Sequence, residues 1–217
     1  MPYLKRDVPC PEPIDCKILT AALDLFVDRG YHNISIHQIQ KQADVSIGSI
    51  YNHFGGKEGI AKALYKHILN EIDELINDII IEIESPTEQC KEIIKQLFEH
   101  TETHQNIIAF VFHTKHTEFL PDETSLWNAS PFIKMRKIIN QGIDKQEFIQ
   151  TDSWVATSAI FGGAIRMIQL RLDHILEKPL PEYYEMVINT AFNGLADDNH
   201  DEALSMIVEL ERTNISR

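Results

Sequence analysis

The chain has 217 residues, 43% of them hydrophobic, and a formal net charge of -13 at pH 7. This length and apolar content suffice for one large core, or for a small domain beside a larger one, and no apolar run approaches the ~18 to 20 residues of a membrane-spanning helix. The start has no apolar secretory segment and the three cysteines lack CxxC spacing, so we expect a cytoplasmic protein without a membrane partner, a disulfide framework or a structural zinc site.

Three short helices are predicted first in the chain, because apolar residues recur there with helical spacing and cap signals separate them. Gly30 ends the first helix, and Ser35 with Gln38 forms a capping box for the second. Asp44 begins a tight turn, after which Ser46 caps the third helix. The expected ranges are 14–29, 36–43 and 47–53. This order predicts a helix-turn-helix unit, which we assign to a domain of residues 1–56.

The rest of the chain, residues 57–217, is predicted to form a larger helical domain for ligand binding and dimerisation. Its first helix extends over 57–83, which is ~40 Å at 1.5 Å per residue and long enough to connect the two domains. Further helices are expected over 87–100, 104–115, 131–146, 153–177, 181–194 and 200–212. Residues 116–129 form the longest expected loop. No stretch shows the alternation of a strand, so the fold class is all-α.

The third helix has the pattern of a DNA-recognition helix. Ile50 and Phe54 face the preceding helices, so the remaining side chains point outward, where a major groove can receive them. These outward residues are Ile47, Gly48, Ser49, Tyr51, Asn52 and His53. Any short amphipathic helix exposes such residues, so the pattern becomes informative only together with its neighbours.

The charge distribution also indicates that the N-terminal part of the chain is the part that binds nucleic acid. Residues 1–60 contain six basic and seven acidic residues, a net of -1, which leaves 14 basic and 26 acidic residues, a net of -12, for the remainder. An acidic body repels DNA, whereas a nearly neutral head can contact phosphates through a few cations and helix N-termini. Lys57 stands at a predicted helix N-terminus, where the helix dipole disfavours a cation unless an anion such as a phosphate binds there.

The segment 18–64 resembles the DNA-binding segment of the TetR family of regulators. The positions that match the family pattern are Ala22, Leu25, Phe26, Gly30, Tyr31, Ile39, Ala43, Val45, Ser46, Gly48, Tyr51, Phe54, Lys57 and Glu58. The chain departs from it at Gln40, Asp44 and Gly56, of which Asp tolerates a left-handed turn and Gly is an acceptable N-cap.

The resemblance implies a repressor that binds palindromic double-stranded DNA as a homodimer and leaves it when a small-molecule effector binds. It also implies that Tyr51, His53 and Lys57 contact the DNA backbone, whereas Ile47, Ser49 and Asn52 lie near bases. We count the two caps, Ser35 and Ser46, among the DNA-binding residues.

The predicted helix around residues 154–172 is apolar on almost all sides, so a second subunit is its simplest cover. Gly162 and Gly163 in its middle indicate a close helix approach or a pocket wall, with a local kink as the alternative. The TetR resemblance implies that the dimer interface consists of helices 153–177 and 181–194 from each subunit.

Aromatic residues in the middle of the body favour an apolar effector cavity, although most of them are expected to be ordinary core. The candidate effector-binding residues are Phe110, His113, Trp127, Phe132, Trp154, Phe161 and Arg166. Arg166 can pair with an anionic group of the effector, but an outward-facing or acid-paired arginine is the more common arrangement.

Two alternatives stay open. A metal-sensing regulator would use His100, His104, His113 and His116, together with Glu99 or Glu118, although surface histidines explain this spacing more simply. A helical adaptor would not bind DNA at all. We expect no enzyme and no cofactor, because the sequence contains neither a nucleophile with its base nor a Gly-rich phosphate loop.

Overall fold

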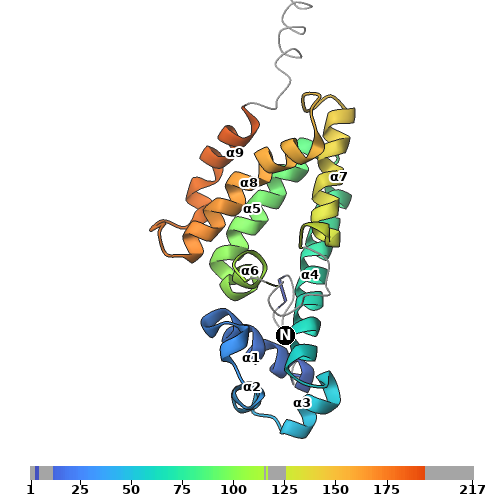
Figure 1. Cartoon of the computed structure of the whole chain (residues 1–217). Helices are drawn as coiled ribbons and strands as arrows, with labels where there is room; N and C mark the ends of the chain where they lie inside the picture. Colours follow the sequence, from blue (N-terminus) through green and yellow to red (C-terminus); the bar gives the residue numbers. More distant parts are fainter. Residues whose placement is uncertain (1–2, 5–11, 115, 117–125, 194–217) are drawn as a thin grey trace, which may run out of the picture.

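Every regular element is helical in the computed structural model, which describes residues 3–4, 12–114, 116 and 126–193 (Figure 1). The α-helices are α1 (Ile14–Arg29), α2 (Ile36–Ala43), α3 (Ile47–Phe54), α4 (Lys57–Glu82), α5 (Pro86–Thr103), α6 (Gln105–Phe112), α7 (Ser130–Asp144), α8 (Ser153–Leu172) and α9 (Tyr184–Phe192). Short 3-10 helices are η1 (Tyr31–Asn33), η3 (Leu126–Asn128) and η4 (Leu180–Tyr183). The all-α prediction is confirmed. The helix predicted over 200–212, and the expected loop over 116–129 apart from its described ends, lie outside the described residues.

The ends of the head helices follow from a few neighbouring side chains. The Ser35 hydroxyl oxygen accepts a hydrogen bond from the Gln38 backbone N–H at 3.3 Å, and the Ser35 N–H donates to the Gln38 side chain at 2.7 Å. This is the predicted capping box. Asp44 ends α2 with a left-handed φ of 52°, and Ser46 caps α3 by accepting from the Ser49 N–H at 3.0 Å. The helix-turn-helix unit is thus held by local contacts.

A glycine in the first turn of α4 allows this helix to begin directly beside the end of α3. A Cβ atom at Gly59 would lie 1.7 Å from the Phe54 carbonyl oxygen, a distance that no side chain tolerates. From there α4 extends out of the head and along the body (Figure 1), where it contacts α5 and α7. Because α4 also contacts α1 and α3, the domain division at residue 56 stays a prediction.

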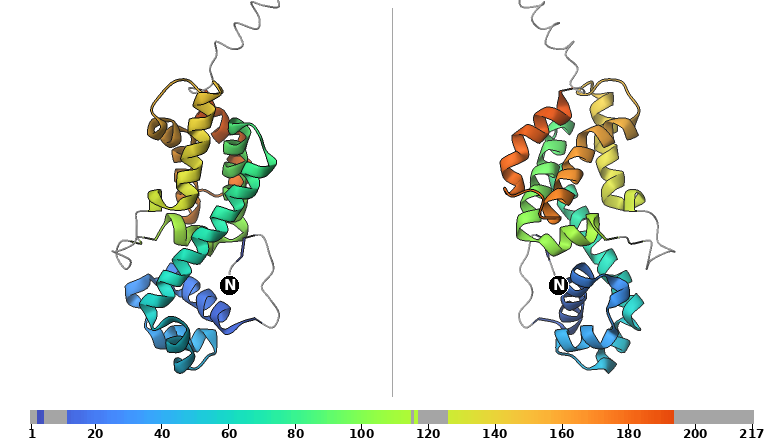
Figure 2. Two further views of the ribbon diagram at one scale, coloured as in Figure 1. Left: turned by 90° about the vertical axis from the view of Figure 1, so that its right-hand side faces the viewer. Right: turned by 60° about the vertical axis from the view of Figure 1, so that its left-hand side comes forward.

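The body consists of α5 to α9 together with the far part of α4 (Figure 2). Helix α5 lies at its centre and contacts α4, α6, α7, α8 and α9. The head and body meet where α1 contacts α6, and the Asn106 side-chain amide donates to Asp24 across this contact at 2.6 Å. Within the described residues, no helix combines the length and apolar character needed to cross a membrane.

Helix α8 is shorter than the predicted 153–177. It ends at Leu172, because His174 has a left-handed φ of 57° and the Arg171 guanidinium donates to the Leu176 carbonyl at 2.9 Å. The following segment includes η4, which contacts α5, and α9 begins directly after it. Sequence periodicity continued through this turn and therefore did not reveal it.

Candidate functional site

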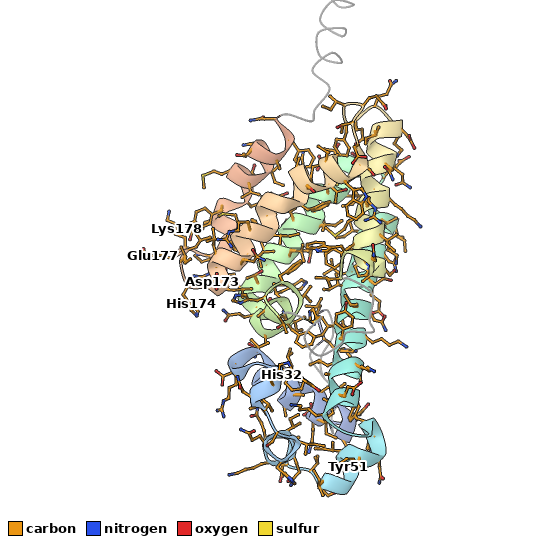
Figure 3. All side chains as sticks on the ribbon, viewed as in Figure 1. His32, Tyr51, Asp173, His174, Glu177 and Lys178 are labelled. Atoms are coloured by element: carbon orange, nitrogen blue, oxygen red, sulfur yellow. The ribbon has the colours of Figure 1, made fainter. Side chains whose placement is uncertain are left out.

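Helix α3 presents its second half to solvent at the end of the molecule away from the body. Ile50 is fully buried against the head core, whereas Gly48, Tyr51, Asn52 and His53 are exposed. Tyr51 is 55% exposed and projects from the tip of the head (Figure 3). The outward face expected from the sequence therefore exists as a free surface of the chain.

Two α3 residues of the predicted DNA-binding set are half-buried instead of exposed, because they lie at the start of α3. Ile47 and Ser49 lie on the first turn, at the edge of the exposed face. The Ser49 hydroxyl lies 2.9 Å from the Ser46 hydroxyl, so the cap partly occupies it. The Ser35 hydroxyl likewise bonds the Gln38 side chain at 2.9 Å. Both serine caps therefore hold helix starts in the free protein.

Lys57 is placed differently from the expectation of a cation that awaits an anion. Its Nζ donates hydrogen bonds to the carbonyl oxygens of Tyr31 at 3.0 Å and Ile34 at 2.8 Å, and it lies 4.1 Å from the centroid of the Tyr31 ring. Burial lowers the pKa of the Lys57 ammonium. The two carbonyls supply the negative partner that we assigned to a phosphate, so the phosphate contact stays a prediction.

A pocket of about 280 Å³ lies between α7 and α8, beside η3. Four of the predicted effector-binding residues line it, namely Trp127, Phe132, Trp154 and Phe161. The Trp127 and Phe132 rings pack edge to face, with centroids 5.3 Å apart. The volume lies just below the ~300 to 1,000 Å³ typical of small-molecule sites.

Among the described residues, one with a charge lines this pocket, and sequence reasoning missed it. Arg136 places its guanidinium carbon 4.0 Å from the centroid of the Trp154 ring. It follows Phe132 by four residues and therefore shares that face of α7. This spacing is the sequence signal that associates Arg136 with the aromatic set.

The other three predicted effector residues lie elsewhere. Phe110 is fully buried in α6 and packs against His116, with ring centroids 4.9 Å apart. His113 lies 3.2 Å from Asp173 and faces a wider polar hollow between head and body. Arg166 is exposed and reaches only Gln169, at 3.4 Å. The structure thus brings none of these three to the α7–α8 pocket.

The four histidines of the metal alternative do not converge. The Nδ1 atoms of His100 and His104 lie 3.3 Å apart, but His113 pairs with Asp173. His116 packs on Tyr65 and Phe110, and burial lowers the pKa of His116 to about 4. Among the residues with described positions, no group of three or more His, Cys, Asp or Glu side chains is arranged to hold a metal ion.

Small and apolar side chains form an exposed face on α8. A Cβ atom at Gly162 or Gly163 would meet no neighbouring atom within 4 Å, so neither glycine marks a close approach inside one chain. Val155, Ser158 and Ala159 continue this face along the helix. On the adjacent α9, Met186 is 58% exposed. The apolar surface predicted for a partner is therefore uncovered in the single chain.

Comparison with known proteins finds a family model that matches the head. Residues 18–64 match the family model described as bacterial regulatory proteins, tetR family. The chain is 29% identical over 106 residues to the HTH-type transcriptional regulator BetI of Brucella anthropi, covering 47% of this chain and 55% of that protein. It is 32% identical over 82 residues to the fatty acid metabolism regulator protein of Bacillus subtilis, covering 38% and 42%. The chain thus spans about half the length of the curated relatives it matches.

The solved structures extend the similarity beyond the head. The transcriptional regulator FadR from Bacillus subtilis in complex with stearoyl-CoA superimposes with a TM-score of 0.68. The match covers 82% of this chain and 97% of that chain, at 23% sequence identity. At this identity the similarity shows that both chains share one fold, including the helical body.

Proposed function

We propose, given that the chain belongs to the TetR family of bacterial regulatory proteins, that it is a ligand-responsive repressor that binds specific DNA sequences as a homodimer. The observation that carries the proposal is the exposed second half of α3, with Tyr51, Asn52 and His53 presented beyond a capped helix start. Access to a bacterial chromosome requires a cytoplasmic location. In this function the protein is a regulator, not an enzyme.

Within the head, the side chains divide by what each can reach. Ile47, Gly48, Ser49 and Asn52 would lie against base edges in the major groove, where hydrogen bonds distinguish the base pairs. Tyr51 and His53 would donate to phosphates beside the groove, and the caps Ser35 and Ser46 would place the starts of α2 and α3 towards the backbone. Lys57 holds the turn before α2 through the Tyr31 and Ile34 carbonyls, and so keeps α2 in position.

The exposed face of α8 and α9 supports a two-fold dimer. Uncovered Val155 and Met186, 59% and 58% exposed, leave apolar surface in water, and the small Ser158, Ala159 and Gly163 allow a second helix to approach closely. A two-fold pair carries two copies of α3. Their target would be a DNA palindrome with half-sites one helical turn, about 34 to 36 Å, or a multiple of it apart.

A chain of contacts supports coupling between the pocket and the head. Gln169, two turns after Phe161 on α8, donates to the Phe112 carbonyl at the end of α6 at 3.2 Å. At the other end of α6, Asn106 donates to Asp24 of α1. A ligand between α7 and α8 that displaces α8 would thereby shift α6 against the head. The long α4 provides a second connection. Linkage requires that bound operator weaken ligand binding by the same factor as ligand weakens operator binding.

Selection from a random pool of DNA duplexes with the full chain tests this function. We expect enrichment of one two-fold symmetric motif, recovered again when the enriched pool is selected a second time. A pool that stays random after repeated selection with folded protein would overturn DNA recognition. Enrichment of an asymmetric single half-site would retain it but overturn the dimer.

A further inference from the structure

We propose that the α7–α8 pocket binds amphipathic carboxylates, with the carboxylate at Arg136 and the apolar part among Trp127, Phe132 and Phe161. The proposal deepens the proposed function, on which it rests in taking this pocket as the effector site. It names the chemical class of the ligand.

The pocket leaves unusually large aromatic surfaces in water. Trp127 is 47% exposed and Trp154 is 50% exposed, and they are the two tryptophans of the chain. Both line the pocket together with the buried Phe132 and Phe161. Each large ring that moves out of water contributes to binding in proportion to its apolar area. The surface is therefore suited to the hydrocarbon part of a ligand.

Arg136 gives the pocket a positive charge. Of the described residues that line the pocket it is the one with a charge, and its guanidinium is half-buried over the Trp154 ring. The Trp154 ring thus covers the guanidinium from one side. Planar N–H donors in this geometry fit a carboxylate with two parallel hydrogen bonds.

The other polar side chains in the described lining, Thr157 and Ser158, carry no charge. The Thr157 hydroxyl donates to the Ser153 carbonyl at 2.6 Å, so it is already used within α8. A chain with a net charge of -13 repels anions over most of its surface. A single guanidinium in an apolar pocket therefore selects for an anion that also carries hydrocarbon, and against both free inorganic anions and neutral lipids.

Size narrows the class further. A volume of about 280 Å³ accommodates a ligand of modest size, such as a medium-chain or aryl-substituted carboxylic acid. An aliphatic and an aromatic acid share the chemistry that the pocket recognises. Octanoate is the probe for the aliphatic acids and 3-phenylpropionate is the probe for the aromatic acids. Octanol serves as the neutral control for octanoate, with the same chain length.

Both tryptophans line the pocket, so intrinsic fluorescence reports binding without a label. Titration of the full chain should show saturable changes with octanoate or 3-phenylpropionate, and at least one of them should bind about tenfold or more tightly than octanol. Arg136→Met should remove this preference and leave octanol binding within about twofold. The matched control is Lys137→Met, because Lys137 is an exposed cation on the neighbouring position of α7. This control should retain the preference.

Calorimetric titration repeats the comparison independently of changes in the Trp154 environment. If Arg136→Met does not fold by circular dichroism, Arg136→Lys keeps the charge but not the planar donors and should reduce the preference. Equal binding of octanoate, 3-phenylpropionate and octanol, no saturable binding of either acid, or a preference that survives in a folded Arg136 variant would overturn the proposal. Carboxylate binding without any effect on operator binding would instead support the ligand class and overturn the effector role. If neutral ligands alone release DNA, the result would support the effector role of the pocket and overturn the carboxylate class.

Discussion

The ammonium group of Lys57 lies 4.1 Å from the centroid of the Tyr31 ring and donates a hydrogen bond to the Tyr31 carbonyl oxygen at 3.0 Å. The same group reaches the Ile34 carbonyl at 2.8 Å. The first residue of the long helix α4 thus holds the segment between α1 and α2. A cation at a helix N-terminus is explained by these partners within the protein.

Removal of this cation should weaken the head itself. Lys57→Ala leaves two carbonyls without their charged donor, and we expect a loss of about 1 to 3 kcal/mol in the free energy of unfolding. Lys41→Ala is the matched control, since Lys41 is an exposed cation of α2, and it should leave stability unchanged. Chemical denaturation followed by circular dichroism measures both variants.

The same variant distinguishes a brace from a phosphate contact. A lost phosphate contact reduces the magnitude of the salt slope of DNA binding by about 1 per head. If Lys57 also contacts phosphate, as the sequence predicts, Lys57→Ala should reduce the slope by about 1 in addition to lowering stability, whereas a stability loss with an unchanged slope would assign Lys57 to the brace alone. A slope change of about 1 with unaltered stability would show that Lys57 binds phosphate and does not brace the head.

Gly163→Leu should separate folding from dimerisation. A Cβ atom at Gly163 meets no described atom outside its own stretch of helix within 4 Å, so the larger side chain starts in open space on the single chain and replaces a poor helix former by a good one. A second copy packed on α8 would collide with it. Light scattering at micromolar concentration should therefore show a dimer for the wild type and a monomer with unchanged helical content for the variant.

Asn140→Leu, at an exposed position of α7, is the control for added apolar surface and should remain dimeric. A monomeric wild-type chain would contradict the dimer itself. Dimeric Gly163→Leu would instead place the interface away from this part of α8.

Acid should loosen the turn between α8 and α9. Glu102 of α5 accepts from the Arg171 guanidinium at 2.9 Å and from the Leu180 N–H at 3.0 Å, and the hydrogen bonds from Arg171 lower the pKa of Glu102 below 4.5. A carboxylate whose pKa is lower in the folded state than in the unfolded state stabilises the fold at pH values above the unfolded-state pKa. This stabilisation is lost as the pH falls below 4.5 and through the folded-state pKa.

Glu102→Gln should therefore flatten the dependence of unfolding free energy on pH in this acidic range. Glu99→Gln is the control, because Glu99 is exposed on the same helix. Denaturation at a series of pH values between neutral and acid measures the slope. An identical slope in wild type and Glu102→Gln would rule out this linkage.

The head was predictable from sequence because short-range contacts determine where its helices end. Ser35 and Gln38 are three residues apart, and Asp44 and Ser46 bracket the turn, so each cap is visible in a few adjacent letters. Gly59 was not predictable as a contact point, since its need arises from the carbonyl of Phe54 approaching in space. Local chemistry predicts element ends, whereas close approaches require the packed structure.

The pocket was predictable only in part. Helical spacing indicates which residues share a face of one helix, but not how two helices lie against each other. Phe132 and Phe161 come together because α7 packs on α8, whereas Phe110 is fully buried and packs against His116. Arg136 follows Phe132 by four residues and lines the pocket, whereas Arg166 of α8 lies in solvent, and only the packed structure shows this difference.

Reading of DNA bases by the exposed face of α3 is tested most directly by the affinity of the full chain for its selected operator and for a scrambled duplex, each over a series of salt concentrations. A variant with Ser49→Ala and Asn52→Ala should lose ~1 to 3 kcal/mol per base contact on the operator, while its affinity for the scrambled duplex and its salt slope stay nearly unchanged. Asn140→Ala, on the exposed surface of α7, should behave as the wild type. Full operator affinity in the folded, dimeric double variant would contradict base recognition by this face of α3.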